Sequence, residues 1–366
     1  MLSIAGKPVL QYVIESLALN GIRNIIIVVG YRREQVFDYF GNGEQFGVEI
    51  TYVTQERQLG TAHALMQAKE TVLDEFIVLP GDNLIQADTI SRFVTMSPSA
   101  VLVKRVGNTA RYGVITAEKE VLRKITEKPG AAESGVVNTG IYSLDKLVFD
   151  HINTETGLPD VINEMIKGGH TLYACETEGT WLDVVYPWDI LTLNDAVLPS
   201  IPANIGGTIE AGASVNGLVS IGKGTVIRSN SYIIGPVVIG EHCDIGPNVF
   251  ISPATSIGHN VTISPFTEIS NSVIGDDVSI GSSSVIQDSV IDDGCQIRGR
   301  FTACSDDAEI KINNEHHRVK VGAMLGAGCG LGTGVVAQPG VVIGNQSRIQ
   351  SMKLVSGKLP DRSLVL

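Results

Sequence analysis

Two places near the start of the chain combine residue types that could bind a phosphorylated ligand. Gln55 follows the apolar stretch 49–54, and its carboxamide can both donate to and accept from the edge of a base. Gly60 and Thr61 open the next expected helix, where glycine lets a planar ring approach the backbone and the helix amino end favours phosphate. Asp82 directly follows a second apolar run, and a carboxylate there suits Mg²⁺, which prefers one or two carboxylates with phosphate oxygens and water.

A third group is spread over the next hundred residues as the pairs and triplets YG, EKP, NTG and WLD. Each member also has an ordinary structural interpretation, because Lys128 could be a solvated surface charge and Asn138 the first residue of an Asx-turn. A lone aspartate after a strand, such as Asp82, is often a turn or cap residue. Their shared order along the chain is what favours a single site: Tyr112, Gly113, Glu127, Lys128, Asn138, Trp181 and Asp183.

The elements that must position these residues alternate between helix and strand. Residues 7–20 have helical spacing of apolar side chains, and 24–29 is a continuous β-branched run of the kind that is buried on both faces of a parallel sheet. A shorter strand is expected at 49–54, a helix at 61–69 and another buried strand at 76–79. This βαβ pattern predicts a doubly wound α/β domain, in which ligands collect at the carboxyl ends of the strands.

The second half has a different period. Nine isoleucines stand at every sixth position from Ile221 to Ile269, and the series continues with one-residue slips to Ile297 and resumes from Leu325 to Ile349. A six-residue period fits neither a helix nor an ordinary strand and predicts a β-solenoid whose aliphatic residues share one core. Residues 298–320 interrupt the period. We therefore expect a first domain at 1–197, a linker at 198–207 with two prolines and two glycines, and a solenoid at 208–366.

Composition narrows the classes of partner. The net charge of −12 opposes general binding to nucleic acid or to anionic membranes, which need a basic surface. No apolar run approaches the roughly 20 residues of a membrane span, and the first residues lack the pattern of a secretory signal, so we expect a cytoplasmic protein. The five cysteines contain no CxxC pair, which argues against a metal cage or a disulfide framework and indicates buried thiols.

The series QxxxxGT, GD, YG, EKP, NTG and WxD resembles the sugar-1-phosphate nucleotidylyltransferases over nearly all of the first half. With the hexad repeat behind it, the whole chain resembles the bifunctional nucleotidylyltransferase–acyltransferases of amino-sugar nucleotide synthesis, especially the archaeal type. The resemblance implies a nucleotide-diphospho-sugar transferase-like α/β domain followed by a left-handed parallel β-helix that trimerises. It also implies that a sugar-1-phosphate attacks a nucleoside triphosphate, UTP or dTTP, and that pyrophosphate leaves.

The same resemblance implies a role for each matching residue. Gln55, Gly60 and Thr61 would read the pyrimidine, and Gly113, Glu127 and Asn138 would hold the sugar hydroxyls. Mg²⁺ would lie between Asp82 and Asp183, and Lys128 would contact the sugar phosphate.

The chain departs from the family pattern in two places. The glycine-rich triphosphate loop, GxGTRxxP followed by PK, is absent, and the first eight residues resemble the stretch just after it. Roughly 20 residues of strand and loop are therefore expected in front, either because the start is set too late or because a paralogue has lost its loop. Losing that strand would leave unpaired backbone groups beside 25–29 or a neighbouring strand.

The acyltransferase histidine of the family pattern NLRHD aligns with Ser305. His316 and His317, in the aperiodic segment, are the candidate substitutes for this general base, with acetyl-CoA as the co-substrate; the alternative is that both are plain surface residues. Three functions therefore stay open: a nucleotidylyltransferase with possible N-acetyltransferase activity, a non-catalytic regulatory or scaffold paralogue that binds nucleotide sugar, and an acyltransferase alone.

Overall fold

The computed structural model describes residues 3–95, 99–128, 133–153, 157–312 and 315–366. The chain forms two compact units: Val9–Asp183 is the first, and residues 3–8 join Val184–Leu366 in the second. The boundary thus falls between Asp183 and Val184, earlier than the expected boundary after residue 197, and the first residues leave the first unit. Each unit is described by itself.

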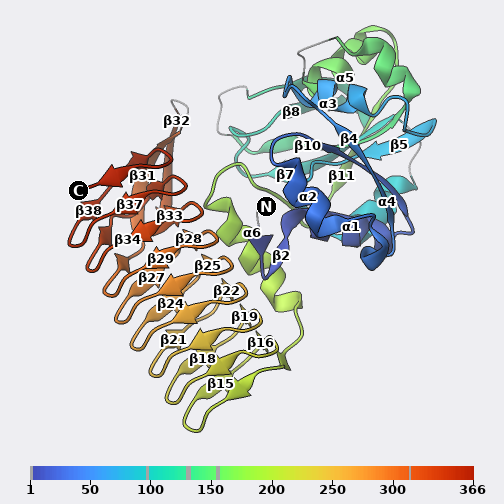
Figure 1. Ribbon diagram of the computed structural model, residues 1–366. Helices are drawn as coiled ribbons and strands as arrows, with labels where there is room; N and C mark the ends of the chain where they lie inside the picture. Colours follow the sequence, from blue (N-terminus) through green and yellow to red (C-terminus); the bar gives the residue numbers. More distant parts are fainter. Residues whose placement is uncertain (1–2, 96–98, 129–132, 154–156, 313–314) are drawn as a thin grey trace. The chain divides into compact units, whose positions relative to one another are not determined.

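The first unit is an α/β domain around a mixed six-stranded sheet of order β5-β10-β7-β11-β9-β8, with the parallel pair β3-β4 and the antiparallel pair β12-β6 beside it. The strands expected at 24–29 and 49–54 are confirmed, and the run 76–79 lies largely in β5. The helix expected from residue 7 begins at Val9, because Lys7–Pro8 (β2) pairs with Ser3–Ile4 (β1). The helices are α1 Val9–Leu19, α2 Arg33–Phe40, α3 Thr61–Gln67, α4 Ala87–Val94 and α5 Leu158–Lys167, with short 3-10 turns η1 Glu44–Phe46 and η2 Lys146–His151. The strands are β3 Asn24–Val29, β4 Glu49–Thr54, β5 Glu75–Val78, β6 Asn83–Ile85, β7 Ala100–Val106, β8 Val114–Glu118, β9 Val121–Thr126, β10 Gly135–Asp145, β11 Tyr173–Thr177 and β12 Trp181–Asp183 (Figure 1).

An apolar cavity of about 1200 Å³, which we call the slot, is lined by both β3 and β5. Within the described residues β3 pairs only with β4 and β5 only with β10, so each strand keeps one edge without a strand partner, as expected beside 25–29. Leu10, Val13 and Leu17 of α1 line the slot, as do Ala64 and Leu65 of α3. The slot therefore has the surroundings of a strand buried on both faces.

The second unit consists mainly of a parallel β-solenoid, which we call the prism. Three sheets of nine, nine and eight strands form its faces, and every neighbouring pair of strands is parallel (Figure 1). The isoleucines six residues apart fall on the three faces in turn, so that Ile245, Ile263 and Ile280 are successive partners in one sheet. The inward residues form one continuous buried core, which confirms the hexad interpretation. Its handedness stays a prediction.

The strands of the prism are short. The first face contains β13 Asn204–Ile205, β16 Val219–Ile221, β19 Val237–Ile239, β22 Thr255–Ile257, β25 Val273–Ile274, β28 Val290–Ile291, β33 Ala323–Leu325, β36 Val341–Ile343 and β39 Lys358–Leu359. The second contains β14 Thr208–Ile209, β17 Val226–Ile227, β20 Asp244–Ile245, β23 Thr262–Ile263, β26 Ser279–Ile280, β29 Gln296–Ile297, β34 Gly330–Leu331, β37 Arg348–Ile349 and β40 Leu364–Val365. The third contains β15 Ser214–Asn216, β18 Tyr232–Ile234, β21 Phe250–Ile251, β24 Glu268–Ser270, β27 Val285–Gln287, β30 Thr302–Ala303, β35 Val336–Ala337 and β38 Leu354–Val355.

The interruption of the period is a β-hairpin inserted into the prism. Its strands are β31 Asp306–Ile312 and β32 Glu315–Val321, and they pair antiparallel. The aperiodic segment is shorter than expected, because Thr302–Ala303 still forms β30 and pairs with β27 and β35 of the third face. Inserting a hairpin at a corner leaves the coil above and the coil below in register.

Helix α6, Asp189–Val197, is tied to the prism and to the first residues of the chain through one buried side chain. Asn194 accepts a hydrogen bond from the Ala5 amide at 3.0 Å and donates to the Ala254 carbonyl at 2.9 Å. The segment expected to be a linker continues as a 3-10 turn, η3 Leu198–Ser200, and then enters the first coil at Asn204. These contacts explain why residues 3–8 and α6 belong to the second unit.

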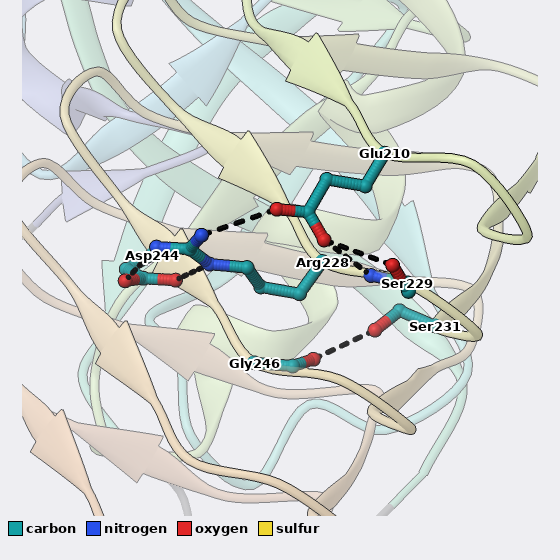
Figure 2. A network of polar contacts seen from close by, with 6 residues as sticks. All are labelled: Glu210, Arg228, Ser229, Ser231, Asp244 and Gly246. Atoms are coloured by element: carbon teal, nitrogen blue, oxygen red, sulfur yellow. Dashed lines mark hydrogen bonds and ion pairs between the residues drawn. The ribbon is translucent and has the colours of Figure 1, made fainter.

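The outer surface of the first coils carries an ion-pair network (Figure 2). Arg228 donates to Asp244 at 2.8 Å and to Glu210 at 3.1 Å, and the second oxygen of Glu210 accepts from the amide and hydroxyl of Ser229. Hydrogen bonds from Ser229 are the main cause that lowers the pKa of Glu210 below its ordinary value. The hydrogen bond from Arg228 is the main cause that lowers the pKa of Asp244. The network links three successive coils.

Four of the five cysteines are buried, as expected, and Cys304 is exposed. Over the described part of the chain, the helices are too short or too polar for any of them to span a bilayer.

Candidate functional site

The two carboxylates expected to hold a cation are brought together by the pairing of β6 with β12. Asp183 is the direct partner of Asn83 in this antiparallel pair, and Asp82 lies in the turn just before Asn83. The hydroxyl of Tyr112 donates to Oδ1 of Asp183 at 2.9 Å, which holds that carboxylate in place. Partial burial raises the pKa of Asp82, although a hydrogen bond from its own backbone amide opposes the shift.

The predicted NTG segment lies beside the same turn. The side chain of Asn83 donates to the Thr139 carbonyl at 3.2 Å, and a Cβ added to Gly140 would lie 3.0 Å from Pro80. Asn138 accepts from the Gly140 amide at 3.0 Å, which is the Asx-turn of the ordinary interpretation. The Asx-turn bends β10 next to the turn that contains Asp82.

The residues expected to hold a sugar also meet. The backbone amide of Asn138 donates to the Gly113 carbonyl at 2.8 Å, and a Cβ on Gly113 would lie 2.5 Å from Oε1 of Glu127. Glycine is thus required at position 113 for Glu127 to occupy its place. Burial, reinforced by the charge of Asp160, raises the pKa of Glu127, and Lys128 lowers it.

Lys128 itself is exposed, with a φ of 36° in the left-handed region. Pro129 of the EKP segment lies outside the described residues. The role of Lys128 as a phosphate ligand stays a prediction.

The residues predicted to bind the nucleotide, Gln55, Gly60 and Thr61, lie around the turn between β4 and α3. Gly60 has a φ of 110°, which side-chain-bearing residues rarely adopt. Nε2 of Gln55 donates to the Gly60 carbonyl at 3.1 Å and lies 2.8 Å from Nδ1 of His63. The hydroxyl of Thr61 accepts from the Leu158 amide at 2.8 Å and so fixes the start of α5.

The slot connects these groups. Its lining includes Thr61 at the start of α3, Gly81 beside Asp82, and Asn138 with Gly140. Sequence reasoning did not single out His63, Asn83 or Tyr142, which hold Gln55, Thr139 and Asn138 respectively. His63 could have been noticed as a polar residue one helical turn into the segment that follows Gly60.

The two candidate acyl-transfer bases belong to the second unit and have different surroundings. His316 is exposed on β32, and its Nδ1 lies 2.6 Å from Oε1 of Glu309. The ring of His317 packs 4.2 Å from that of Tyr186 and 5.7 Å from that of Trp188. Both histidines of the aperiodic segment lie in a strand of the hairpin.

The donor set suits a hard cation with an incomplete protein shell. Throughout the described residues there is no cluster of three or more His, Cys, Asp or Glu side chains that could cage a metal ion. Two neighbouring carboxylates, Asp82 and Asp183, match Mg²⁺, because this ion keeps several waters and substrate oxygens as ligands. Asp82 and Asp183 would leave the remaining ligand positions of Mg²⁺ to water and to phosphate oxygens of a substrate.

Comparison with known families agrees with this geometry. The family model described as nucleotidyl transferase matches residues 1–199, and the model described as GMPPB C-terminal domain matches residues 233–308. The bifunctional protein GlmU of Methanococcus vannielii is 33% identical over 387 residues, which cover 100% of this chain and 91% of that protein. A bifunctional sugar-1-phosphate nucleotidylyltransferase/acetyltransferase of Sulfurisphaera tokodaii is 32% identical and is matched over 94% of this chain and 89% of its own.

Other relatives match only part of the chain. A glucose-1-phosphate thymidylyltransferase of Streptomyces antibioticus is 31% identical over 70% of this chain and 75% of that protein. A Bacillus anthracis structure, named as a glucose-1-phosphate thymidylyltransferase, superimposes with a TM-score of 0.50 at 27% identity and covers 56% of this chain and 88% of that chain. The family-model match over residues 1–199 and the relatives matched over nearly the whole chain show that the chain belongs to the nucleotidyl transferase family.

Proposed function

We propose that the protein is a sugar-1-phosphate nucleotidylyltransferase, which converts a nucleoside triphosphate and a sugar-1-phosphate to a nucleoside diphosphate sugar and pyrophosphate. The observation that supports the proposal is the β6–β12 pairing, in which Asp183 is the direct partner of Asn83, the residue next to Asp82. Thr61 and Asn138 line the slot, as does Gly81 next to Asp82, whereas Gln55 lines a separate cavity that shares Gly30, Tyr31 and Arg33 with the slot. The curated relatives in the family carry names of the same reaction class.

In this reaction a phosphate oxygen of the sugar-1-phosphate forms a bond to the α-phosphorus in line, and the bond to the β-phosphate oxygen breaks. Pyrophosphate takes the electron pair of the broken bond, so the protein needs no covalent intermediate. Positioning and charge neutralisation are sufficient for such a transfer. Mg²⁺, when bound, would neutralise phosphate charge; Asp82 and Asp183 would hold it, and Tyr112 would keep Asp183 in the required orientation.

The other predicted residues would orient the two substrates. Gln55, Gly60 and Thr61 would bind a pyrimidine of UTP or dTTP, and the helix amino end at Thr61 favours an anionic group nearby. Gly113, Glu127 and Asn138 would face the sugar hydroxyls, with Lys128 as a point charge for its phosphate. The raised pKa of Glu127 fits a carboxyl that gives up hydration for hydrogen bonds to hydroxyls.

The grip on the triphosphate needs donors beyond those in the described residues. We propose that the slot takes one further strand between β3 and β5, with the family's glycine-rich loop at its carboxyl end. The apolar lining from α1, α3 and both strands supports this. A chain extended in front of Ser3 by a strand of about six residues and a GxGTR loop should turn over faster than one extended by glycine and serine; equal rates would contradict the slot proposal.

Acetyl transfer to an amino-sugar phosphate, with acetyl-CoA as the donor, is the second candidate function. The prism supports this function, and so does the Sulfurisphaera tokodaii relative, which is named as a bifunctional nucleotidylyltransferase/acetyltransferase. His316 with Glu309 has the arrangement of a base held by a carboxylate, whereas His317 is packed between aromatic rings. CoA release in the presence of glucosamine-1-phosphate should fall in His316→Ala and persist in His317→Ala; undiminished release in both would reject a histidine base.

We propose that the prism assembles the protein as a homotrimer. The outward column of its third face is mostly apolar, although it includes Ser214, Glu268 and Thr302; Tyr232 and Phe250 stack in it with ring centroids 6.1 Å apart, and Leu354 is 64% exposed. The outward column of the second face is mostly polar, with Asp244, Thr262 and Arg348 among its members. Tyr232→Glu should shift the mass in solution toward the monomer, and an unchanged mass would contradict assembly through this face. The free cysteines fit a reducing compartment, and we place the protein in the cytoplasm.

The decisive assay is pyrophosphate release across a panel of sugar-1-phosphates with UTP and dTTP in the presence of Mg²⁺. We expect release with at least one pair, and loss of release in Asp82→Asn. Binding of a nucleotide sugar without turnover, also in the chain extended by strand and loop, would favour the regulatory or scaffold alternative. CoA release without pyrophosphate release would favour the acyltransferase alone.

A further inference from the structure

The first coil of the prism, residues 204–218, forms one end of the solenoid, and we call its outer surface the open end (Figure 1). The inward residues of the second coil, Ile221, Ile227 and Ile233, are completely buried. Ile205 and Ile209 pair with the first two of these in the sheets, yet Ile205 is 48% exposed and Ile209 is 37% exposed. The aliphatic core therefore reaches the surface at the open end.

The backbone at the open end has groups available for pairing. In later coils the carbonyl of an inward residue accepts a hydrogen bond from the coil before it: Ile221 accepts from the Gly206 amide and Ile239 from the Gly222 amide, both at 2.8 Å. The first strands of the three sheets are β13, β14 and β15, and among the described residues no strand precedes them. The open end thus presents three strand edges.

The open end also has little charge. Natural proteins usually protect exposed strand edges with charged side chains or proline. Glu210 is the single charged residue within 204–218, and Arg228 at 3.1 Å and the amide of Ser229 at 3.0 Å already bind its carboxylate. The whole chain has a net charge of −12, so most of its surface would repel a second copy. At the open end two copies can meet without that repulsion.

The shape of the open end limits what can cover it. Its three strand edges are the sides of a triangle, so an occupant needs three short strand edges in the same arrangement. A second open end has them, because a twofold axis perpendicular to the prism superimposes the triangle on itself and reverses the direction of every strand. One strand then meets its own copy and the other two meet each other, all antiparallel.

We propose that the open end is a docking surface for the open end of a second copy, so that two prisms meet head to head. Docking covers Ile205 and Ile209 and gives the edges of the three first strands partners. The other arrangement, in which the last coil of one copy meets the open end of the next, does not close and forms a filament. Lys358, Asp361 and Arg362 lie in the last coil, and such charges oppose edge pairing.

The test is the mass of the full chain in solution, measured by sedimentation over a range of protein concentrations. We expect the wild type to reach twice the mass of Ile209→Lys. The twofold axis brings the new lysine into the interface twice, so the concentration for half-association should rise at least about 100-fold. The open end is separate from the third face, so the doubling should persist in Tyr232→Glu.

Leu364→Lys is the matched control. Leu364 is 64% exposed in the last coil, and the same substitution there should leave the mass unchanged. Equal masses for the wild type and Ile209→Lys at every concentration would overturn the proposal. Filaments that disappear in Leu364→Lys would also overturn it, because they require the last coil.

Hydrogen exchange of the wild type gives a second readout that needs no variant. The amides of residues 204–218 should exchange more slowly at high protein concentration than at low concentration, because docking gives the edge strands partners. Those of residues 356–366 should exchange at the same rate at both. Exchange in the first coil that does not depend on concentration would refute head-to-head docking.

Discussion

Replacing Ile263 by alanine tests the claim that hexads of aliphatic residues hold the prism together. Ile263 is 1% exposed and lies between Ile245 and Ile280 in its sheet, while Ile257 and Ile269 fill the same coil from the other two faces. Truncating a buried isoleucine to alanine costs about 2–5 kcal/mol, and the cost grows with the cavity that remains. We expect the upper part of that range, about 3–5 kcal/mol, because the cavity cannot close.

The reason lies in the backbone. The Thr262 amide donates to the Val278 carbonyl at 2.9 Å and the Asp244 amide to the Val261 carbonyl at 2.9 Å, so the coil is hydrogen-bonded above and below. Neighbouring strands are therefore held roughly 4.8 Å apart and cannot collapse into the space. Because each coil contacts only its neighbours, the loss should be greatest in the coils around Ile263.

The assay is amide hydrogen exchange followed by mass spectrometry on peptides from the prism. A loss of about 3–5 kcal/mol corresponds to roughly 150- to 4000-fold faster exchange through opening of these coils. Thr262→Ala is the matched control, since Thr262 points outward on the same strand, and Ile263→Val should cost only about 0.5–1.5 kcal/mol. If Ile263→Ala and Thr262→Ala exchange at the same rate, the aliphatic ladder is not what stabilises the prism.

Three further predictions concern charge and backbone. Mg²⁺ affinity should fall as the pH drops through the raised pKa of Asp82, because the ionised carboxylate is the form that binds the ion. The fall should occur at higher pH than for an ordinary aspartate, and a titration of Asp82→Asn should not show it. Arg228→Ala should speed hydrogen exchange in the first coils less than about tenfold at neutral pH. Glu210 and Asp244 have lowered pKa values in the folded state, so the stability they contribute is present above the ordinary carboxyl pKa and is lost as the pH falls through the folded values. A difference in exchange rate between Arg228→Ala and the wild type that persists at that low pH would contradict the network. Gly60→Ala should lower stability by about 1–3 kcal/mol in thermal unfolding and weaken UTP binding, because its φ of 110° is strained for alanine; unchanged values would mean that the turn relaxes freely.

Local patterns predicted most of the elements. The β-branched run at 24–29 and the strand at 49–54 were found from their residues, because such strands are specified by side chains adjacent in sequence. The helix start at Val9 and the hairpin Asp306–Val321 were missed or misplaced. Both depend on pairing between strands, and pairing is not encoded in the period of a single segment.

The candidate site divides in the same way. The order of motifs predicted Gln55, Asp82 and Asp183 as a group, but only the antiparallel pairing of β6 with β12 places Asp183 opposite Asn83, the residue next to Asp82. Only the tertiary structure shows that the carboxamide of Gln55 contacts the Gly60 carbonyl and the ring of His63.

The sequence by itself determined the prism, since a six-residue aliphatic period has one way to bury its side chains, and every coil repeats the same local rule. The tertiary structure alone decided the contacts of the Gln55 carboxamide, the neighbours of Asp183 and the attachment of residues 3–8 to α6. Each of these depends on hydrogen bonds between distant segments, whose geometry is set by how the chain packs and not by the residues on either side of them.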